Sequence, residues 1–125
     1  MLLLAAACSS PEDDDGAEAS ATAVPGAPTL RGTVGTEDSE DAFEIALVDE
    51  DGAPVTELPA GQYNVEVTDH SGVHDFHLSG GDGAVDEKTG IREQGETTWV
   101  VTFEPGDYRY ICDPHPSMNG LFTVT

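Results

Sequence analysis

A cysteine, a histidine and a methionine lie close together near the end of the sequence, at Cys112, His115 and Met118. Their thiolate, imidazole and thioether groups are soft or borderline ligands, and together they suit copper better than any other common biological metal. A second imidazole, that of His74, lies far upstream. Two histidines and one cysteine in a trigonal set, with a weak axial methionine, are the ligands of a blue-copper electron-transfer site. The pattern therefore predicts one copper ion that carries single electrons.

The segment that carries these ligands is short and stiff. Pro114 and Pro116 bracket His115, which fixes two φ angles and removes two backbone N–H groups. Taken singly, Cys112 would be read as a small buried hydrophobic residue and Met118 as a gap filler. Their combination with a histidine in one stiff loop favours a metal site. Zinc fits this set less well, because zinc sites use cysteine, histidine and carboxylate but not methionine.

Short strands are expected in the rest of the folded part. Apolar and polar residues alternate in three runs, residues 43–47, 63–68 and 98–103, and each run offers one apolar face. Residues 121–124 are expected to form the last strand, and residues 79–96, which are rich in glycine and charge, a long connection. Turn-forming residues separate the runs. The pattern predicts an all-β fold, a Greek-key sandwich of two sheets.

The upstream run of residues 74–78 contains two histidines, and the strand period distinguishes them. Because successive side chains in a strand point to opposite faces, His74 shares a face with Phe76 and Leu78, which we expect in the core. Asp75 and His77 point the other way. His74 is therefore the expected ligand, and His77 is expected at the surface beside the site.

The 125 residues suffice for one domain, preceded by a different kind of segment. Residues 1–8, MLLLAAAC, resemble the truncated end of a bacterial lipoprotein signal with Cys8 as the lipidated residue; an incidental apolar N-terminus is the alternative. Residues 9–28 have almost nothing to bury, so we expect a disordered acidic tether. We expect residues 29–125 to form the folded domain. This order predicts an extracytoplasmic protein, in the periplasm or at the outer face of the cell membrane, held to the membrane by a lipid anchor.

Acidic residues dominate the charge of the chain, whose formal net charge is -21. Within residues 29–125, 20 acids face four bases, a net of -16. Nucleic acid would be repelled by such a domain, so we expect no nucleic-acid partner. The acids are spread along the domain, which favours adaptation to high salt or plain solubility. Steering of a basic protein partner is the alternative.

On these residues the chain resembles the cupredoxins, the family of small blue copper proteins. The pattern C-x2-H-P-x-M-x-G, here Cys112 to Gly120, is similar to the ligand loop of the amicyanin type, and the run at residues 74–78 agrees with that type. The resemblance covers residues 29–125 and implies a cupredoxin-like Greek-key β-sandwich that holds one type 1 copper ion.

The same resemblance implies a role for each residue of the site. It implies His74, Cys112 and His115 as equatorial ligands and Met118 as the axial ligand. It also implies that His115 lies at the surface in an apolar patch through which electrons leave. This patch, to which Pro114, Pro116 and Met118 would contribute, is where a redox donor or acceptor protein is expected to dock.

Positions beside the ligands depart from the family pattern. The residue after the first histidine is usually Asn, which bridges to the residue after the cysteine; here the two positions hold Asp75 and Asp113. Two carboxylates cannot bridge unless they share a proton, so we expect them either to splay apart or to titrate as a coupled pair with one raised pKa. Pro114 lacks an N–H for the thiolate. That leaves the N–H of Asp75 as the expected donor to Cys112 and predicts a modest reduction potential.

Three functions compete for this ligand set. A one-electron carrier needs only an exposed edge of His115 and redox partners. An extracytoplasmic copper carrier or buffer without redox turnover would use the same ligands, but a stiff loop and two methionines in the whole chain favour retention over delivery. A multicopper enzyme would need further histidine clusters, which four histidines in total do not supply. We therefore expect an electron carrier and no enzymatic activity.

Overall fold

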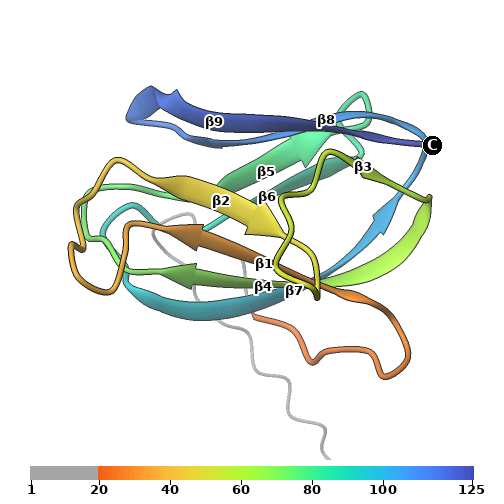
Figure 1. The fold of residues 1–125 in the computed structure, drawn as a ribbon, viewed down its shortest axis with the longest axis horizontal. Coiled ribbons are helices and arrows are strands. Elements are labelled where there is room, and N and C mark those ends of the chain that lie inside the picture. The colour runs from red at the N-terminus through yellow and green to blue at the C-terminus, as the bar shows by residue number, and fades with distance from the viewer. Residues whose placement is uncertain (1–19) are drawn as a thin grey trace, which may run out of the picture.

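The computed structural model describes residues 20–125; Cys8 and the rest of residues 1–19 lie outside this range. The described residues form nine strands in two sheets (Figure 1). One sheet has the order β2-β1-β4-β7, and the other has the order β3-β9-β8-β5-β6. The strands are β1 (Thr29–Val34), β2 (Ile45–Val48), β3 (Glu57–Leu58), β4 (Gly61–Asp69), β5 (His77–Gly80), β6 (Val85–Lys88), β7 (Gly95–Phe103), β8 (Gly106–Cys112) and β9 (His115–Val124).

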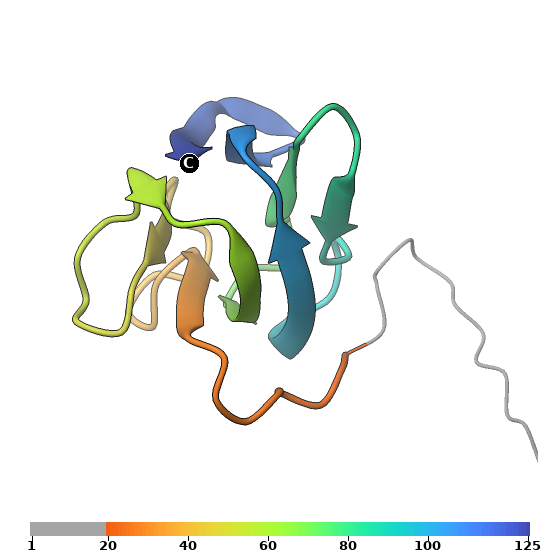
Figure 2. The same ribbon diagram turned by 90° about the vertical axis from the view of Figure 1, so that its right-hand side faces the viewer.

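The expected all-β sandwich is confirmed, and the two sheets pack face to face (Figure 2). Each inner face is made by the apolar half of an alternating run, as in β4, where Tyr63, Val65 and Val67 are buried. β4 pairs with β7 in antiparallel register and with β1 in parallel register. Within the described part of the chain, no helix has the length and hydropathy that a membrane span requires.

Aromatic rings fill the end of the core that lies away from the predicted ligands. Phe103 lies edge-on to both Tyr108 and Phe122, with ring centroids 5.0 and 5.6 Å apart. The hydroxyl of Tyr108 donates to the carbonyl of Glu104 at 2.8 Å and accepts from the Glu104 N–H at 3.1 Å. This pair of bonds fixes the turn between β7 and β8, and so it fixes where the cysteine-bearing strand begins.

Two strand predictions were wrong in their bounds. β6 lies within residues 79–96, which were expected to be a connection, and it pairs with β5. The last strand starts at His115 rather than at residue 121. The reason is a register shift: Ile111 pairs with Asn119, whereas Cys112 pairs with His115. Residues 116–118 therefore have no partner in the ladder. Pro116, which has no backbone N–H, is one of them, so it is not required to donate a ladder hydrogen bond.

Residues 20–28, the last part of the expected tether, are hydrogen-bonded to the domain. The N–H of Ala21 donates to the carbonyl of Thr98 in β7 at 2.7 Å. The buried side chain of Asn64 in β4 accepts from the Val24 N–H at 2.8 Å and donates to the Val24 and Ala27 carbonyls. The ordered chain therefore begins ahead of β1, because a buried amide satisfies backbone groups that a free tether would leave to water.

Candidate metal centre

Three of the predicted ligands, His74, Cys112 and His115, lie close together. Cys112 ends β8, and β1 and β4 end at the same end of the sandwich (Figure 1). Cys112 is the last residue of β8 and His115 the first of β9, so the tight turn between them places both side chains at the same edge. His74 comes from the connection between β4 and β5 and is fully buried. His74 is therefore the inward-facing histidine, as expected, although it lies outside any strand and the strand period is not the reason.

Three donor atoms form a compact triangle. The Nδ1 atoms of His74 and His115 are 2.9 Å apart, and the Sγ of Cys112 lies 3.6 Å from the first and 3.7 Å from the second. The point in their plane that is equidistant from the three atoms lies about 2 Å from each, close to the roughly 2.0 Å of metal bonds to imidazole nitrogen and a little shorter than the roughly 2.3 Å of bonds to thiolate sulfur. Two nitrogens and one sulfur at these separations could hold one metal ion, and the set fits copper.

A backbone contact fixes the tautomer of His74. Its Nε2 lies 3.1 Å from the carbonyl oxygen of Asp41. Because a carbonyl can only accept, Nε2 carries the hydrogen and Nδ1 keeps its lone pair, which points at the other two donors. This outer hydrogen bond orients the ring and makes Nδ1 more basic, as such contacts do for metal-binding histidines.

The apolar surface patch expected around His115 is present in part, but its members differ from those expected. Met118, in β9, is 4% exposed and belongs to the core, so it does not contribute to a surface patch. His115 is half-buried, and Pro114 and Pro116 are exposed beside it. The exposed apolar surface instead includes Phe43, which is 62% exposed and whose ring centroid lies 4.6 Å from that of His115.

The environment of the Cys112 sulfur corrects one expectation. Burial raises the pKa of the thiol, and backbone hydrogen bonds from Asp75 and His115 oppose that rise. The expectation of a single backbone donor was therefore wrong, because the tight turn brings the N–H of His115 to the sulfur as well. Two donors place less negative charge on the thiolate than one would, which weakens the argument for a modest potential.

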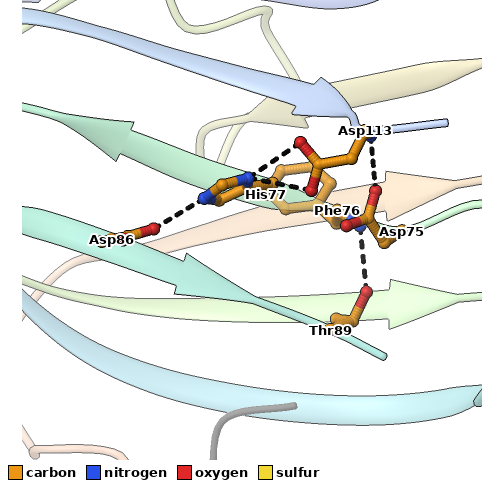
Figure 3. A network of polar contacts seen from close by, with 6 residues as sticks. All are labelled: Asp75, Phe76, His77, Asp86, Thr89 and Asp113. Carbon is orange, nitrogen blue, oxygen red and sulfur yellow. Dashed lines mark hydrogen bonds and ion pairs between the residues drawn. The ribbon is translucent and has the colours of Figure 1, made fainter. Parts of the chain in front are cut away.

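Asp75 and Asp113 are linked through the backbone. The N–H of Asp113 donates to Oδ1 of Asp75 at 2.7 Å (Figure 3). Asp75 is 1% exposed, although the strand period placed it outward with His77. That period fails here because β5 begins only at His77, so the residues before it follow no ladder. The turn that follows Cys112 covers the Asp75 carboxyl and buries it.

The two carboxyls titrate as a coupled pair, which is the second of the two arrangements expected for them. Burial raises the pKa of Asp75 to about 7, and the neighbouring Asp113 carboxylate adds to this rise. Burial opposes the ionisation of Asp113, but hydrogen bonds from Asp75 and His77 outweigh it and lower the Asp113 pKa. The shared proton therefore resides on Asp75, while Asp113 carries the negative charge.

His77 provides the countercharge for that carboxylate. Its Nδ1 lies 2.9 Å from Oδ2 of Asp113, and its Nε2 lies 2.6 Å from Oδ1 of Asp86 (Figure 3). Both ring nitrogens must carry hydrogen to donate to carboxylates, so the ring is an imidazolium. His77 is therefore beside the site rather than in it, as the strand period predicted, and it holds the loop that follows Cys112.

A buried hydroxyl ties the histidine segment to β4. Thr89 Oγ1 accepts from the Phe76 N–H at 2.9 Å and donates to Oδ2 of Asp69 at 3.0 Å. The other oxygen of Asp69 accepts from the Ser71 N–H at 2.9 Å. Asp69, Ser71 and Thr89 are all buried. Because His74 lies between Ser71 and Phe76, these bonds fix both sides of the segment that carries it.

Phe43 and Asp41 are the residues of this region that sequence reasoning missed. Alternation placed Phe43 on the inner face of a strand, but β2 begins only at Ile45. Phe43 therefore belongs to the loop before β2, where its ring covers the two imidazoles. Asp41 acts through its backbone carbonyl, which any residue type would supply. No side-chain pattern could have indicated that contact.

Comparison with known proteins supports the same assignment. The model of the family described as copper binding proteins, plastocyanin/azurin family, matches residues 44–125. Amicyanin-alpha of Methylorubrum extorquens (strain ATCC 14718 / DSM 1338 / JCM 2805 / NCIMB 9133 / AM1) is 38% identical over 52 residues, which are 41% of this chain and 44% of that protein. The match thus spans less than half of that relative.

Solved structures agree on the fold. Reduced rusticyanin superposes with a TM-score of 0.59 at 18% identity and 78% coverage of both chains. Rusticyanin from Thiobacillus ferrooxidans gives 0.55 at 15% identity, with 78% of this chain and 76% of that chain covered. The family match covers well over half of the chain and includes the Cys112–Met118 loop. The chain therefore belongs to the plastocyanin/azurin family of copper-binding proteins, as a cupredoxin whose cofactor is one type 1 copper ion.

Proposed function

We propose that this protein is a one-electron carrier at the outer face of a membrane, with His74, Cys112 and His115 as equatorial copper ligands and Met118 as the axial ligand. The observation that carries the proposal is the triangle of two Nδ1 atoms and one Sγ, with sides of 2.9, 3.6 and 3.7 Å. A bound copper ion would supply the change between Cu(I) and Cu(II). The protein keeps the donors in place while the charge changes.

Rigid support of the ligands favours electron transfer over copper delivery. His74 is held by the Asp41 carbonyl, and the segment around it by the Thr89 hydroxyl. Cys112 and His115 are paired with each other across the turn between β8 and β9. Ligands fixed in this way reorganise little when the copper changes oxidation state, and they also release the ion slowly.

Electrons would enter and leave at an apolar surface that we call the exit face, formed by Phe43, Val73, Pro114, His115 and Pro116. Phe43 is 62% exposed and Val73 46% exposed. His115 connects this face to the other two donors. A redox donor or acceptor that docks here comes within contact distance of a copper ligand without any need for a substrate pocket.

The membrane location rests on the N-terminal sequence. The apolar run that ends at Cys8 and the polar segment after it resemble a lipoprotein anchor and its tether. We propose that a lipid on Cys8 holds the domain to the membrane surface. Mass spectrometry of the protein purified from its own cells would show a diacylglyceryl cysteine at this position, and an unmodified Cys8 in the mature protein would refute the anchor.

The electron-transfer proposal is tested by the visible spectrum of the purified protein with one equivalent of Cu(II). We expect an intense blue thiolate-to-copper band that ascorbate bleaches and ferricyanide restores. The band should be absent in Cys112→Ser. A protein that binds copper tightly but stays colourless would instead be a carrier or buffer of copper without redox turnover.

A further inference from the structure

The first described residues, 20–28, lie against the edge and the outer face of one sheet. β7 is the edge strand of the sheet β2-β1-β4-β7, so its outer backbone groups have no partner strand among the described residues. At Thr98 this segment supplies the partners: the Thr98 carbonyl accepts from the Ala21 N–H at 2.7 Å, and the Thr98 N–H donates to Ser20 Oγ at 3.0 Å. Figure 2 shows the segment, in orange, passing beneath this sheet from β1 to the far side of β7. The chain therefore joins the domain at the β7 edge.

The buried side chain of Asn64 shows that this contact belongs to the folded domain. In β4 the residues before and after Asn64 point into the core, so Asn64 itself points to the outer face of the sheet. It is only 3% exposed there, because the segment lies over it. Its side chain accepts from the Val24 N–H at 2.8 Å and donates to the carbonyls of Val24 and Ala27 at 3.0 and 3.3 Å. The Asn64 N–H also donates to the Pro28 carbonyl at 2.9 Å, so one residue of the sheet holds most of the segment.

Fixing these residues shortens the chain between the lipid anchor proposed at Cys8 and the domain. If the chain joined the domain only at β1, the 20 residues 9–28 would separate the two; with the segment fixed from Ser20 onward, the 11 residues 9–19 do so. Because an extended chain spans at most roughly 3.5 Å per residue, the greatest distance between anchor and domain falls from about 70 Å to about 40 Å. The domain is therefore kept nearer the membrane than the length of the N-terminal sequence indicates.

The segment also changes the place at which the chain leaves the domain. β1 begins at the end of the sandwich opposite the turn between β8 and β9 (Figure 1). A tether that left the domain there would hold it by that end, with the exit face turned away from the membrane. Thr98, beside which the chain leaves instead, pairs with Glu66 and lies between the two ends of β4. Attachment along this side leaves the copper end free to approach the membrane surface.

We propose that residues 20–28, which we call the strap, move the membrane attachment of the domain from the start of β1 to the β7 edge and thereby bring the copper end close to the membrane surface. The partner that suits this arrangement is a redox protein held in the same membrane, with its own redox centre near the surface. A redox protein on a facing membrane would be out of reach. This inference rests on the lipid anchor and the electron-carrier function proposed above.

The test uses the copper-loaded full chain, coupled through Cys8 to a maleimide-headgroup lipid in phosphatidylcholine vesicles. The coupling is selective because Cys112, the other of the two cysteines, is buried and bound to copper. It also makes the test independent of whether cells attach a lipid to Cys8. Nitroxide-headgroup lipids in the same vesicles serve as the probe of the membrane surface. Pulsed EPR then measures the distances between Cu(II) and the nitroxides.

Two variants release the strap, one from each side of the contact. The first carries Ala21→Pro and Val24→Pro, which remove the two strap N–H groups that donate to β7 and β4. The second carries Asn64→Ala, after which the freed backbone groups of the strap bond to water. A matched control carries Thr22→Pro and Ala23→Pro, because these two exposed residues make no hydrogen bond within the described part of the chain.

In the wild type, the Val24 amide should exchange its hydrogen at least about tenfold more slowly than in a free peptide, and Asn64→Ala should abolish this protection. The EPR signal from short copper–nitroxide distances should fall about threefold in both strap-releasing variants, because the effective concentration of a tethered group falls as its tether lengthens. The control should match the wild type. An unchanged blue band in every variant would show that the copper centre itself is intact.

Three results would overturn the inference. A wild-type Val24 amide that exchanges as fast as in a free peptide would mean that the strap is not docked. Equal distances in the wild type and the two strap-releasing variants would mean that the attachment point does not matter, and an equal loss in the control would mean that stiffness rather than the lost bonds acts. Failure of the proposed function is seen elsewhere: an unmodified Cys8 in the protein from its own cells, or copper that does not cycle with ascorbate and ferricyanide, alters neither measurement.

Discussion

The imidazole of His77 lies 2.9 Å from a carboxylate oxygen of Asp113, the residue that directly follows the cysteine of the copper centre. Asp86 contacts the second ring nitrogen at 2.6 Å, so the ring links β5, β6 and the turn after β8 (Figure 3). The family pattern has an asparagine bridge at this place. In this protein a buried carboxyl at Asp75 makes the backbone bond, and His77 neutralises the carboxylate of Asp113.

Replacement of His77 by glutamine should destabilise the protein by about 1 kcal/mol near pH 6, because the imidazolium and its two charge-assisted hydrogen bonds are lost. Burial lowers the His77 pKa, but contacts with Asp113 and Asp86 outweigh it and raise the pKa above 6.5. This stabilisation is therefore complete below pH 6.5 and lost as the pH rises through the raised value. Urea unfolding across this range measures the effect, and His70→Gln serves as the matched histidine control. A loss that stays constant with pH would contradict the assignment.

The Asp75→Asn variant should be more stable than the wild type at pH 8. Because the folded pKa of Asp75 is raised to about 7, the wild type loses stability as the pH rises from the unfolded value of 3.8 through 7. An asparagine keeps the acceptor for the Asp113 N–H and supplies a permanent donor to the Asp113 carboxylate. The gain should reach about 2–4 kcal/mol at pH 8 and shrink towards pH 4. Urea unfolding in EDTA at both pH values measures it, and equal gains at both would contradict the shared proton.

The sandwich and most of the copper donors could be predicted from the sequence, because both leave patterns among residues that are close together in the chain. Alternation marks a strand wherever a ladder and one buried face exist, as at Tyr63 and Val65. His74 is buried as expected, but it precedes β5, so alternation was not the reason. Ligand chemistry and spacing then pointed to Cys112 and His115, which the fold brings together with His74.

What could not be predicted depends on contacts between segments far apart in sequence. Asp75 is buried because the turn after β8 covers it, and Phe43 is exposed because β2 starts late. The strand β6 is polar at three of its four positions and shows no alternation of apolar residues, so it formed only through its pairing with β5. The ligand role of Met118 stays a prediction that the copper spectrum of a Met118 variant can test.

Thr89→Val should destabilise the protein by about 2 kcal/mol, because it leaves the buried Phe76 N–H without its acceptor and the Asp69 carboxylate without one donor. It should also weaken copper binding, since these bonds hold the segment that carries His74. Thermal unfolding and a copper-competition titration measure the two effects. Thr89→Ser keeps the hydroxyl and should restore most of both. A serine variant as weak as the valine variant would show that the methyl group matters instead.

Gly120→Ala should destabilise the protein by about 1–3 kcal/mol through overpacking. Gly120 pairs with Tyr110 across β8 and β9, and an added Cβ would collide with the Tyr110 ring and its hydroxyl. At Gly72 a Cβ would meet no atom within 4 Å, so Gly72→Ala should change stability by less than about 0.5 kcal/mol. Chemical denaturation of both variants provides the comparison. Similar losses at the two positions would mean that backbone flexibility, and not the ring contact, determines the effect.

The donors of the copper centre are spread unevenly along the chain: Cys112 and His115 are three residues apart, whereas His74 lies 38 residues before the cysteine. His74 lies in the connection that runs from β4 of one sheet to β5 of the other, and the other two donors belong to strands of the sheet that contains β5. A copper ion bound by all three would tie this connection to the turn between β8 and β9 and would close a long loop of chain. Separation of the connection from that turn would then require a copper bond to break first. Escape of the metal and opening of this end of the sandwich would be one coupled event, so amide hydrogen exchange in the connection and the turn should slow when copper is bound.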